Sequence, residues 1–159
     1  SEASRVSGAS RPAATLLIPF GTTAVPAHAP AGTIAASHCD NSWHCHRQVV
    51  TASVDHLDFL NPIRLGELIV LEAQVNRAFH TSVEVGVEVF SENFVKGERK
   101  HTTTAFLTFV AINQEGSPTA VPPLLVKTQE ERRRYREAGE RRKARLAARA
   151  KKRIMKIMM

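Results

Sequence analysis

The sequence predicts an α+β fold in which a long antiparallel sheet wraps around one short central helix, with a basic helix towards the C-terminus. The strongest observation is the segment 83–90, where valine occupies every second position and Glu84 and Glu88 lie between the valines. Strand side chains point alternately to opposite faces, so the valines form one apolar face and the glutamates the other. Segments 67–76 and 100–111 alternate in the same way. Together they predict a sheet of about five strands that is covered on one side.

At 159 residues the chain is long enough for one domain with an apolar core. We expect a disordered N-terminus at 1–14, a sheet domain at 15–126, and a basic helix and tail at 127–159. The first 126 residues hold 8 Lys and Arg against 11 Asp and Glu, a net charge of −3, whereas residues 127–159 hold 14 against 4, a net charge of +10. Any polyanion partner is therefore expected to bind the tail.

No apolar run approaches the length of a membrane span, and residues 1–11 lack the hydrophobic core of a signal peptide. The two cysteines, Cys39 and Cys45, are too few for a disulfide scaffold. These features predict a cytoplasmic protein with reduced thiols.

The first elements in chain order are an edge strand, a loop and a helix. Residues 15–20 are a short apolar run that contains a proline, which favours a strand at the edge of the sheet. Residues 21–30 carry one glycine and two prolines and are expected to form a loop. The alanine-rich segment 31–38 predicts a short helix, with Pro30 suited to its first turn. We expect this helix to cover the apolar face of the sheet.

The strand segments follow the predicted helix. In 48–59, Val50, Ala52 and Val54 are expected to share one face of the strand. A Lys-Gly pair at 96–97 marks a hairpin before the last long strand. The strands after this helix are therefore expected to be joined by short turns.

A long helix is expected to begin at Thr128 and to end near residue 152. Thr128 and Glu131 have the spacing of a capping box, in which each side chain accepts a hydrogen bond from the backbone N–H of the other residue. The prominent apolar residues of this helix are few: Tyr135, Ala138 and Leu146. We therefore expect most of the helix to be solvated or to lie on a partner.

Several short segments occur in the order that is typical of one protein family. They are Val-Val-Thr-Ala-Ser-Val-Asp at 49–55, Asp58-Phe59-Leu60, Val75-Asn76-Arg77-Ala78-Phe79, Thr81-Ser82-Val83-Glu84-Val85, Val121-Pro122-Pro123 and Glu-Arg-Arg-Lys-Ala-Arg-Leu at 140–146. Over roughly residues 31–146 the chain resembles the hotdog-fold acyl-CoA thioesterase family, of the cytosolic acyl-CoA hydrolase type. The hotdog fold is a sheet wrapped around one helix, which agrees with the predicted arrangement.

The resemblance implies an enzyme that hydrolyses fatty acyl-CoA to free fatty acid and CoA. Such a reaction needs an oriented water molecule, a carboxylate or amide that holds it, and N–H donors for the oxyanion. In similar enzymes the N-terminus of the central helix supplies these donors. No metal or cofactor is implied, because CoA is part of the substrate. Open sheet edges and the resemblance together imply a homo-oligomer, either a dimer or a trimer of dimers.

The chain departs from the family at the central helix, of which the first half is missing. The family has a His-Gly-Gly segment before this helix, an acidic residue in its first half, and an Asn before the glycines. Between Gly21 and Cys39 there is no Gly-Gly, Asp, Glu or Asn. The catalytic residues are therefore unknown. Either this form keeps the fold without catalysis, or His28, His38 or Asp40 acts as a substitute.

The CoA-binding positions of the family are better preserved. The matching residues are Ala52, Ser53, Val54, Thr81, Ser82 and Val83, with Arg141 or Arg142 meeting the phosphates. Strand-end backbone groups and hydroxyls can bond the pantetheine amides, and a guanidinium fork suits phosphate oxygens. Without the resemblance, Ser53 and Thr81 are ordinary polar strand residues.

The sequence contains two further candidate binding sites, one for a metal ion and one for a polyanion. A cluster of nitrogen and sulfur donors could hold zinc: His38, Cys39, His44, Cys45 and His46. A second, more distant ligand pair is missing, so we expect no metal and favour a polar loop with a buried thiol. The basic tail could bind RNA, DNA or anionic lipid, although aromatic residues for base stacking are lacking beyond Tyr135.

The sequence therefore leads to three hypotheses of function. The first is the acyl-CoA thioesterase, and the second is a catalytically impaired acyl-CoA-binding or regulatory subunit of the same fold. The third is a polyanion-binding module that uses the tail, and nucleic acid is not its expected ligand.

Overall fold

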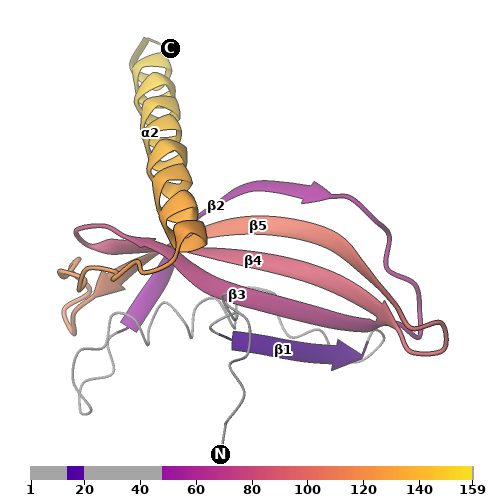
Figure 1. Cartoon of the computed structure of the whole chain (residues 1–159). Helices are drawn as coiled ribbons and strands as arrows, with labels where there is room; N and C mark the ends of the chain where they lie inside the picture. The colour runs from indigo at the N-terminus through magenta and orange to yellow at the C-terminus, as the bar shows by residue number, and fades with distance from the viewer. Residues whose placement is uncertain (1–13, 20–47, 159) are drawn as a thin grey trace, which may run out of the picture.

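The computed structural model describes residues 14–19 and 48–158, which form one antiparallel sheet and one long helix (Figure 1). The elements are β1 (Ala14–Pro19), β2 (Gln48–Phe59), β3 (Leu68–Ala78), β4 (Ser82–Asn93), β5 (Glu98–Ile112) and α2 (Gln129–Met158). The five strands lie in the order β1-β3-β4-β5-β2. The predicted α+β fold with a long antiparallel sheet is confirmed, and the predicted central helix at 31–38 lies outside the described residues.

The strands agree with the sequence patterns to within a few residues. β2 has the expected bounds, and β1, at one edge of the sheet, confirms the edge strand predicted from its proline. Gly97 has a φ of 66°, a left-handed conformation that glycine adopts without strain, and it forms the hairpin between β4 and β5. β2 forms the other edge and pairs only with β5 among the described strands.

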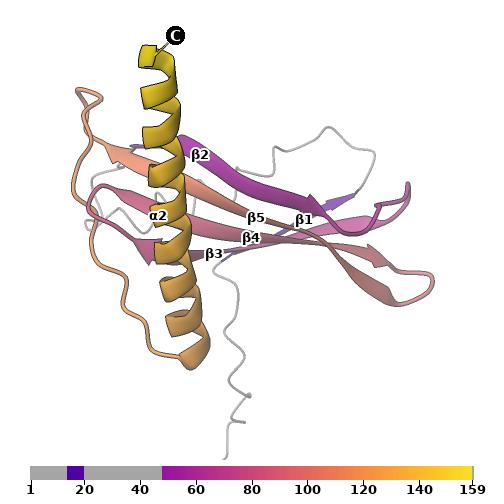
Figure 2. The same cartoon turned by 90° about the horizontal axis from the view of Figure 1, so that it is seen from above.

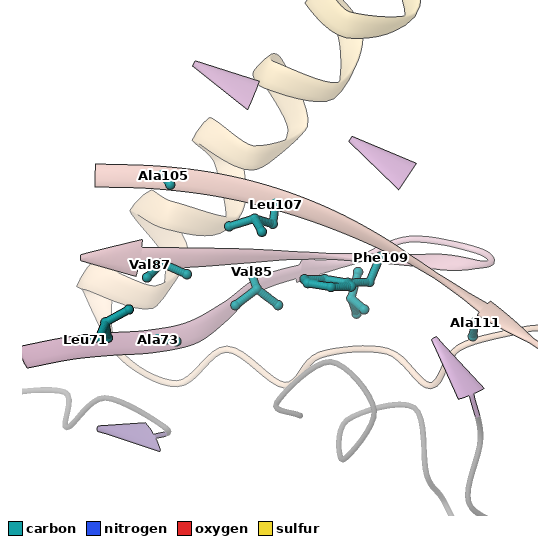
Figure 3. Close-up of a cluster of buried hydrophobic side chains, with 9 residues drawn as sticks. Leu71, Ala73, Val85, Val87, Ala105, Leu107, Phe109 and Ala111 are labelled. Carbon is teal, nitrogen blue, oxygen red and sulfur yellow. The ribbon is translucent and has the colours of Figure 1, made fainter. Parts of the chain in front are cut away.

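The alternating residues of the central strands form the apolar core shown in Figure 3. Val85 of β4 lies opposite Val75 of β3 and Leu107 of β5, so that side chains of three strands meet in one row. The buried cluster comprises Leu71, Ala73, Val83, Val85, Val87, Ala105, Leu107, Phe109 and Ala111. Strand alternation thus predicted this face correctly.

The other face of the sheet is not the open surface that the sequence predicts. Glu84 has 0% exposed surface, whereas Glu88, four residues further along β4 on the same face, is exposed. α2 crosses the sheet on this side, as Figure 2 shows, and it covers the end of β4 that carries Glu84. α2 therefore covers this face of the sheet where it crosses β4.

The capping box predicted for α2 is present. The backbone N–H of Glu131 donates to Thr128 Oγ1 over 3.1 Å, and the backbone N–H of Thr128 donates to Glu131 Oε2 over 2.9 Å. The helix continues beyond the predicted end near 152 and reaches Met158. Ala138 is its one fully buried residue in the described structure, which agrees with a largely solvated helix.

The predicted faces of β2 were wrong, because the strand contains two bulges. Its pairing with β5 shifts between Thr51 and Ser53 and again between Val54 and Leu57. A bulge adds one residue and reverses the alternation after it. As a result Val50 shares a face with Ser53, and Val54 points to the opposite face.

Candidate functional site

An open groove of about 530 Å³ lies where α2 crosses the end of the sheet formed by β2 and β5. The α2 groove, as we call it, is lined by Ser53, Val54, Asp55, Phe106, Arg141, Ala144, Arg145, Ala148, Arg149 and Lys152. The two bulges of β2 flank the strand residues of this set, so the irregular backbone of β2 shapes one wall of the groove.

The helical wall of the groove is a cationic face with small residues between the charges. Residues 141, 145, 149 and 152 are separated by four, four and three positions, a spacing that places them on one side of an α-helix. Ala144 and Ala148 lie on the same side, where short side chains leave room between helix and sheet. The groove therefore combines positive charge with an apolar floor that includes Phe106.

Two of these cations attach α2 to β2. Arg145 Nη1 donates to the carboxylate of Asp55 in an ion pair whose side chains are only 12% and 17% exposed. Arg149 Nη2 donates to the carbonyl oxygen of Ala52 over 3.2 Å. Arg149 and Lys152 lie on exposed helix positions, so they are the groove cations that a bound anion can reach.

Arg141 occupies the inner end of the groove, where it neutralises Glu84. Its Nη2 and Nε donate to Glu84 Oε1 over 2.7 and 3.1 Å, and its guanidinium lies 3.7 Å above the centre of the Phe106 ring. Asn76 Nδ2 donates to the same oxygen over 3.2 Å. Because a buried carboxylate is costly without a cation, Arg141 is committed to this pair.

Beneath α2, four polar side chains form one row across the sheet. Arg77, Glu84, Thr108 and Ser53 lie opposite one another in β3, β4, β5 and β2, and we call them the polar row. Each has one buried atom without a hydrogen-bond partner among the described residues: Arg77 Nε, Glu84 Oε2, Thr108 Oγ1 and Ser53 Oγ. Buried polar atoms usually have partners. Ser53 is the member of the row that lines the α2 groove.

The eight residues expected to bind CoA separate into two groups. Ser53, Val54 and Arg141 line the α2 groove, and the Ala52 carbonyl accepts the hydrogen bond of Arg149 beside it. The other four lie outside the groove: Thr81, Ser82, Val83 and Arg142. The structure thus brings together only half of the expected set.

The second group lies at the turn between β3 and β4. Phe79 N–H donates to the carbonyl of Ser82 over 2.7 Å, and the Arg142 guanidinium lies 4.3 Å from the centre of the Phe79 ring. Arg142 is therefore near Ser82, although it is away from the groove. Val83 has 0% exposed surface and belongs to the apolar core on the other face, so its side chain is not available to a ligand in the groove.

The sequence reasoning missed several residues of the groove: Asp55, Phe106, Arg145, Arg149 and Lys152. The helix residues carried a readable signal, because they repeat the spacing of Arg141 along the predicted helix. Asp55 and Phe106 carried none, since their orientation depends on the bulges of β2 and on the position of α2.

The catalytic and metal candidates predicted from the sequence fall in a part of the chain that the structure does not describe. His28, His38 and Asp40, and the cluster from His38 to His46, lie outside the described residues. Within residues 14–19 and 48–158, no group of three His, Cys, Asp or Glu side chains is placed to hold a metal ion. In the same part of the chain, no helix has the length and apolar character needed to cross a membrane.

A family model and the sequence of a curated relative both match this chain, and they indicate the same family. A model of the Thioesterase superfamily matches residues 21–97. An uncharacterized acyl-CoA thioester hydrolase of Bacillus subtilis is 44% identical over 88 residues, which are 55% of this chain and 51% of that protein. The chain thus spans about half the length of this curated relative.

Solved structures support the same family. An acyl-CoA hydrolase from Staphylococcus aureus, solved in complex with butyryl coenzyme A, coenzyme A and coenzyme A disulfide, is 34% identical and has a TM-score of 0.62. The match covers 70% of each chain. A hexameric acyl-CoA thioesterase in its apo form is 41% identical with a TM-score of 0.63, and the match covers 67% of this chain and 69% of that one.

Proposed function

The chain belongs to the hotdog-fold acyl-CoA thioesterase family, and we propose that it binds acyl-CoA and hydrolyses the thioester to a free fatty acid and CoA. In this reaction a water oxygen adds to the thioester carbonyl carbon, the C–S bond breaks, and the sulfur leaves as the CoA thiol. The observation that carries the proposal is the α2 groove, in which a cationic helix face meets an apolar floor.

The groove suits the chemistry of CoA. The coenzyme carries a diphosphate and a further ribose phosphate, and Arg149 and Lys152 supply exposed positive charge for them. Phe106 supplies apolar surface for the uncharged part of the coenzyme. Arg142 together with Thr81 and Ser82 would be reached only by a ligand that extends to the turn between β3 and β4. Arg141 supports the groove through Glu84.

Hydrolysis also requires a catalytic group, and the candidates for it, His28, His38 and Asp40, lie outside the described residues. The alternative function, an acyl-CoA-binding or regulatory subunit without catalysis, shares the groove and differs only in turnover. We propose further that the protein is a homo-oligomer, because the related hexamer has the same fold and because the edge strand β2 exposes apolar side chains. A cytoplasmic location stays a prediction from the sequence.

The role of the groove is tested by replacing its two exposed cations together, Arg149→Ala with Lys152→Ala, and measuring CoA binding by titration calorimetry. Loss of the charged contacts is expected to raise the Kd of CoA by about tenfold to a hundredfold. The matched control is Arg132→Ala with Lys143→Ala, which removes the same residue types from α2 outside the groove lining. An equal loss of affinity in both variants would show that the groove is not the binding site.

The enzyme and the binding subunit are separated by thiol release from palmitoyl-CoA. The thioesterase releases CoA thiol, whereas the binding subunit retains acyl-CoA without turnover. A variant with His28, His38 and Asp40 replaced by alanine tests whether any turnover comes from these residues. Turnover that disappears in this variant assigns catalysis to a substitute group, and binding without turnover in the parent chain rejects hydrolysis.

A further inference from the structure

Beyond the contact of Arg149 with β2, the end of α2 extends past the edge strand β2 (Figures 1 and 2). Residues 146–158 carry large apolar side chains in solvent. The exposed fractions are 49% for Leu146, 59% for Ile154, 57% for Met155, 76% for Ile157 and 81% for Met158. Scattered apolar residues on a surface are ordinary, but a contiguous group indicates an interaction site.

Most of these side chains form one stripe. With 3.6 residues per turn, the apolar residues separated by three or four positions lie on one side of the helix. The apolar stripe, as we define it, comprises Leu146, Ala147, Ala150, Ile154, Ile157 and Met158. The groove residues Arg145, Ala148 and Lys152 lie on the opposite side of the same turns, so the stripe faces away from the sheet. Met155 lies outside the stripe.

The helix segment that carries the stripe contains positively charged residues and no negatively charged ones. From Arg141 to Met158 the helix holds nine Lys and Arg and no Asp or Glu. Lys151 lies at one border of the stripe, and Arg153 and Lys156 lie beyond its other border. All three are exposed. The end of α2 is thus an amphipathic helix with a basic polar face.

We propose that the apolar stripe docks α2 on the surface of an anionic lipid membrane. Such a surface matches both features, because the stripe can enter the boundary between headgroups and acyl chains while the lysines and arginines contact lipid phosphates. A nucleic acid matches the charge but gives the stripe nothing to bury. A second copy of the helix matches the stripe but brings the same positive charge to the contact. The inference is independent of acyl-CoA hydrolysis.

The test is cosedimentation of the full chain with vesicles. We expect the chain to bind vesicles of phosphatidylcholine and phosphatidylglycerol and to bind vesicles of phosphatidylcholine alone only weakly. Binding to the anionic vesicles is expected to fall as the salt concentration is raised. Ile154→Asn is expected to reduce partitioning into the anionic vesicles about tenfold, because an isoleucine side chain is no longer buried. Met155→Asn is the matched control, since it removes an apolar side chain of nearly equal exposure outside the stripe.

Two parallel measurements distinguish membrane binding from loss of the helix and from self-association. Circular dichroism checks that both variants retain the helix, and sedimentation velocity without lipid reports their oligomeric state. Equal partitioning of Ile154→Asn and Met155→Asn would overturn the proposal, as would equal binding to the neutral vesicles. Dissociation of an oligomer by Ile154→Asn without a change in vesicle binding would assign the stripe to a second copy. Binding to a single-stranded RNA with no vesicle binding would assign the charge to nucleic acid.

Discussion

Glu84 is a carboxylate with no exposed surface, and its environment supplies one cation and one amide. Arg141 and Asn76 both donate to Oε1, while Oε2 has no partner among the described residues. The small space around this network is set by Gly86, where a Cβ atom would lie 2.8 Å from Asn76 Nδ2. The Glu84–Arg141 pair is thus one of the polar contacts that hold α2 over the sheet, together with those of Arg145 and Arg149 to β2.

Glu84→Gln is expected to lower the free energy of unfolding by about 3 kcal/mol, because Arg141 loses its buried countercharge while it remains packed on Phe106 and keeps only the longer contact with Glu137. The value is at the low end for a broken buried pair, since Arg141 is 23% exposed. Urea unfolding measures the change. Glu88→Gln removes an exposed carboxylate from the same face of the same strand, so equal losses in the two variants would exclude a special role for the Glu84 pair.

At the scale of single elements, the start of α2 was predictable and the shape of β2 was not. The capping box is local, so the identities of Thr128 and Glu131 were sufficient to locate the helix start. The bulges of β2 depend on how Thr51, Ser53 and Val54 pair with another strand, and the alternating valines gave no sign of them. The groove wall built from these residues was therefore only partly predicted.

The capping box is also expected to be visible as a titration. Hydrogen bonds from the backbone N–H groups of Thr128 and Lys127 lower the pKa of Glu131 below its ordinary value of 4.5. Because the pKa is depressed in the folded state, the stabilisation is present above the unfolded pKa and is lost as the pH falls through the folded value.

Thr128→Ala removes one half of the box. The variant is expected to lose about 1 kcal/mol of stability and to shift the pKa of Glu131 upwards, as measured by NMR titration of its carboxyl carbon. Gln129→Ala changes the neighbouring residue and leaves both side chains of the box in place. A Glu131 pKa that is the same in all three proteins would show that the Thr128 hydroxyl does not help to hold the Glu131 carboxylate in the box.

At the scale of the whole molecule, the sequence predicts which residues form the sheet better than what covers it. Alternation identified the apolar core from Leu71 to Ala111, because that pattern belongs to each strand separately. The burial of Glu84 depends on α2, which lies more than forty residues further along the chain, and no local pattern carries that contact. The α2 groove combines these long-range relations, which explains why only three of the eight expected CoA-binding residues line it.

Among the described strands, β2 has a neighbour on one side only, and such an edge favours assembly. Val50, Val54 and Phe59 of β2 are 45%, 58% and 77% exposed. An edge strand with free backbone groups and exposed apolar side chains is suited to pairing with another copy. The bulges of β2 interrupt its regular pairing within the chain, so the residues near its end, such as Phe59, are the clearest candidates for a contact between copies.

Phe59→Lys is therefore expected to shift the protein towards smaller species in sedimentation velocity, because a charge at the end of the edge strand opposes its burial between copies. Phe94→Lys is the control, since Phe94 is 73% exposed in the hairpin between β4 and β5, away from the edge. Both variants replace the same side chain at similar exposure, so a difference between them reports position alone. An unchanged distribution for Phe59→Lys would move the contact between copies away from β2, and would leave the exposed stripe of α2 as the next surface to test.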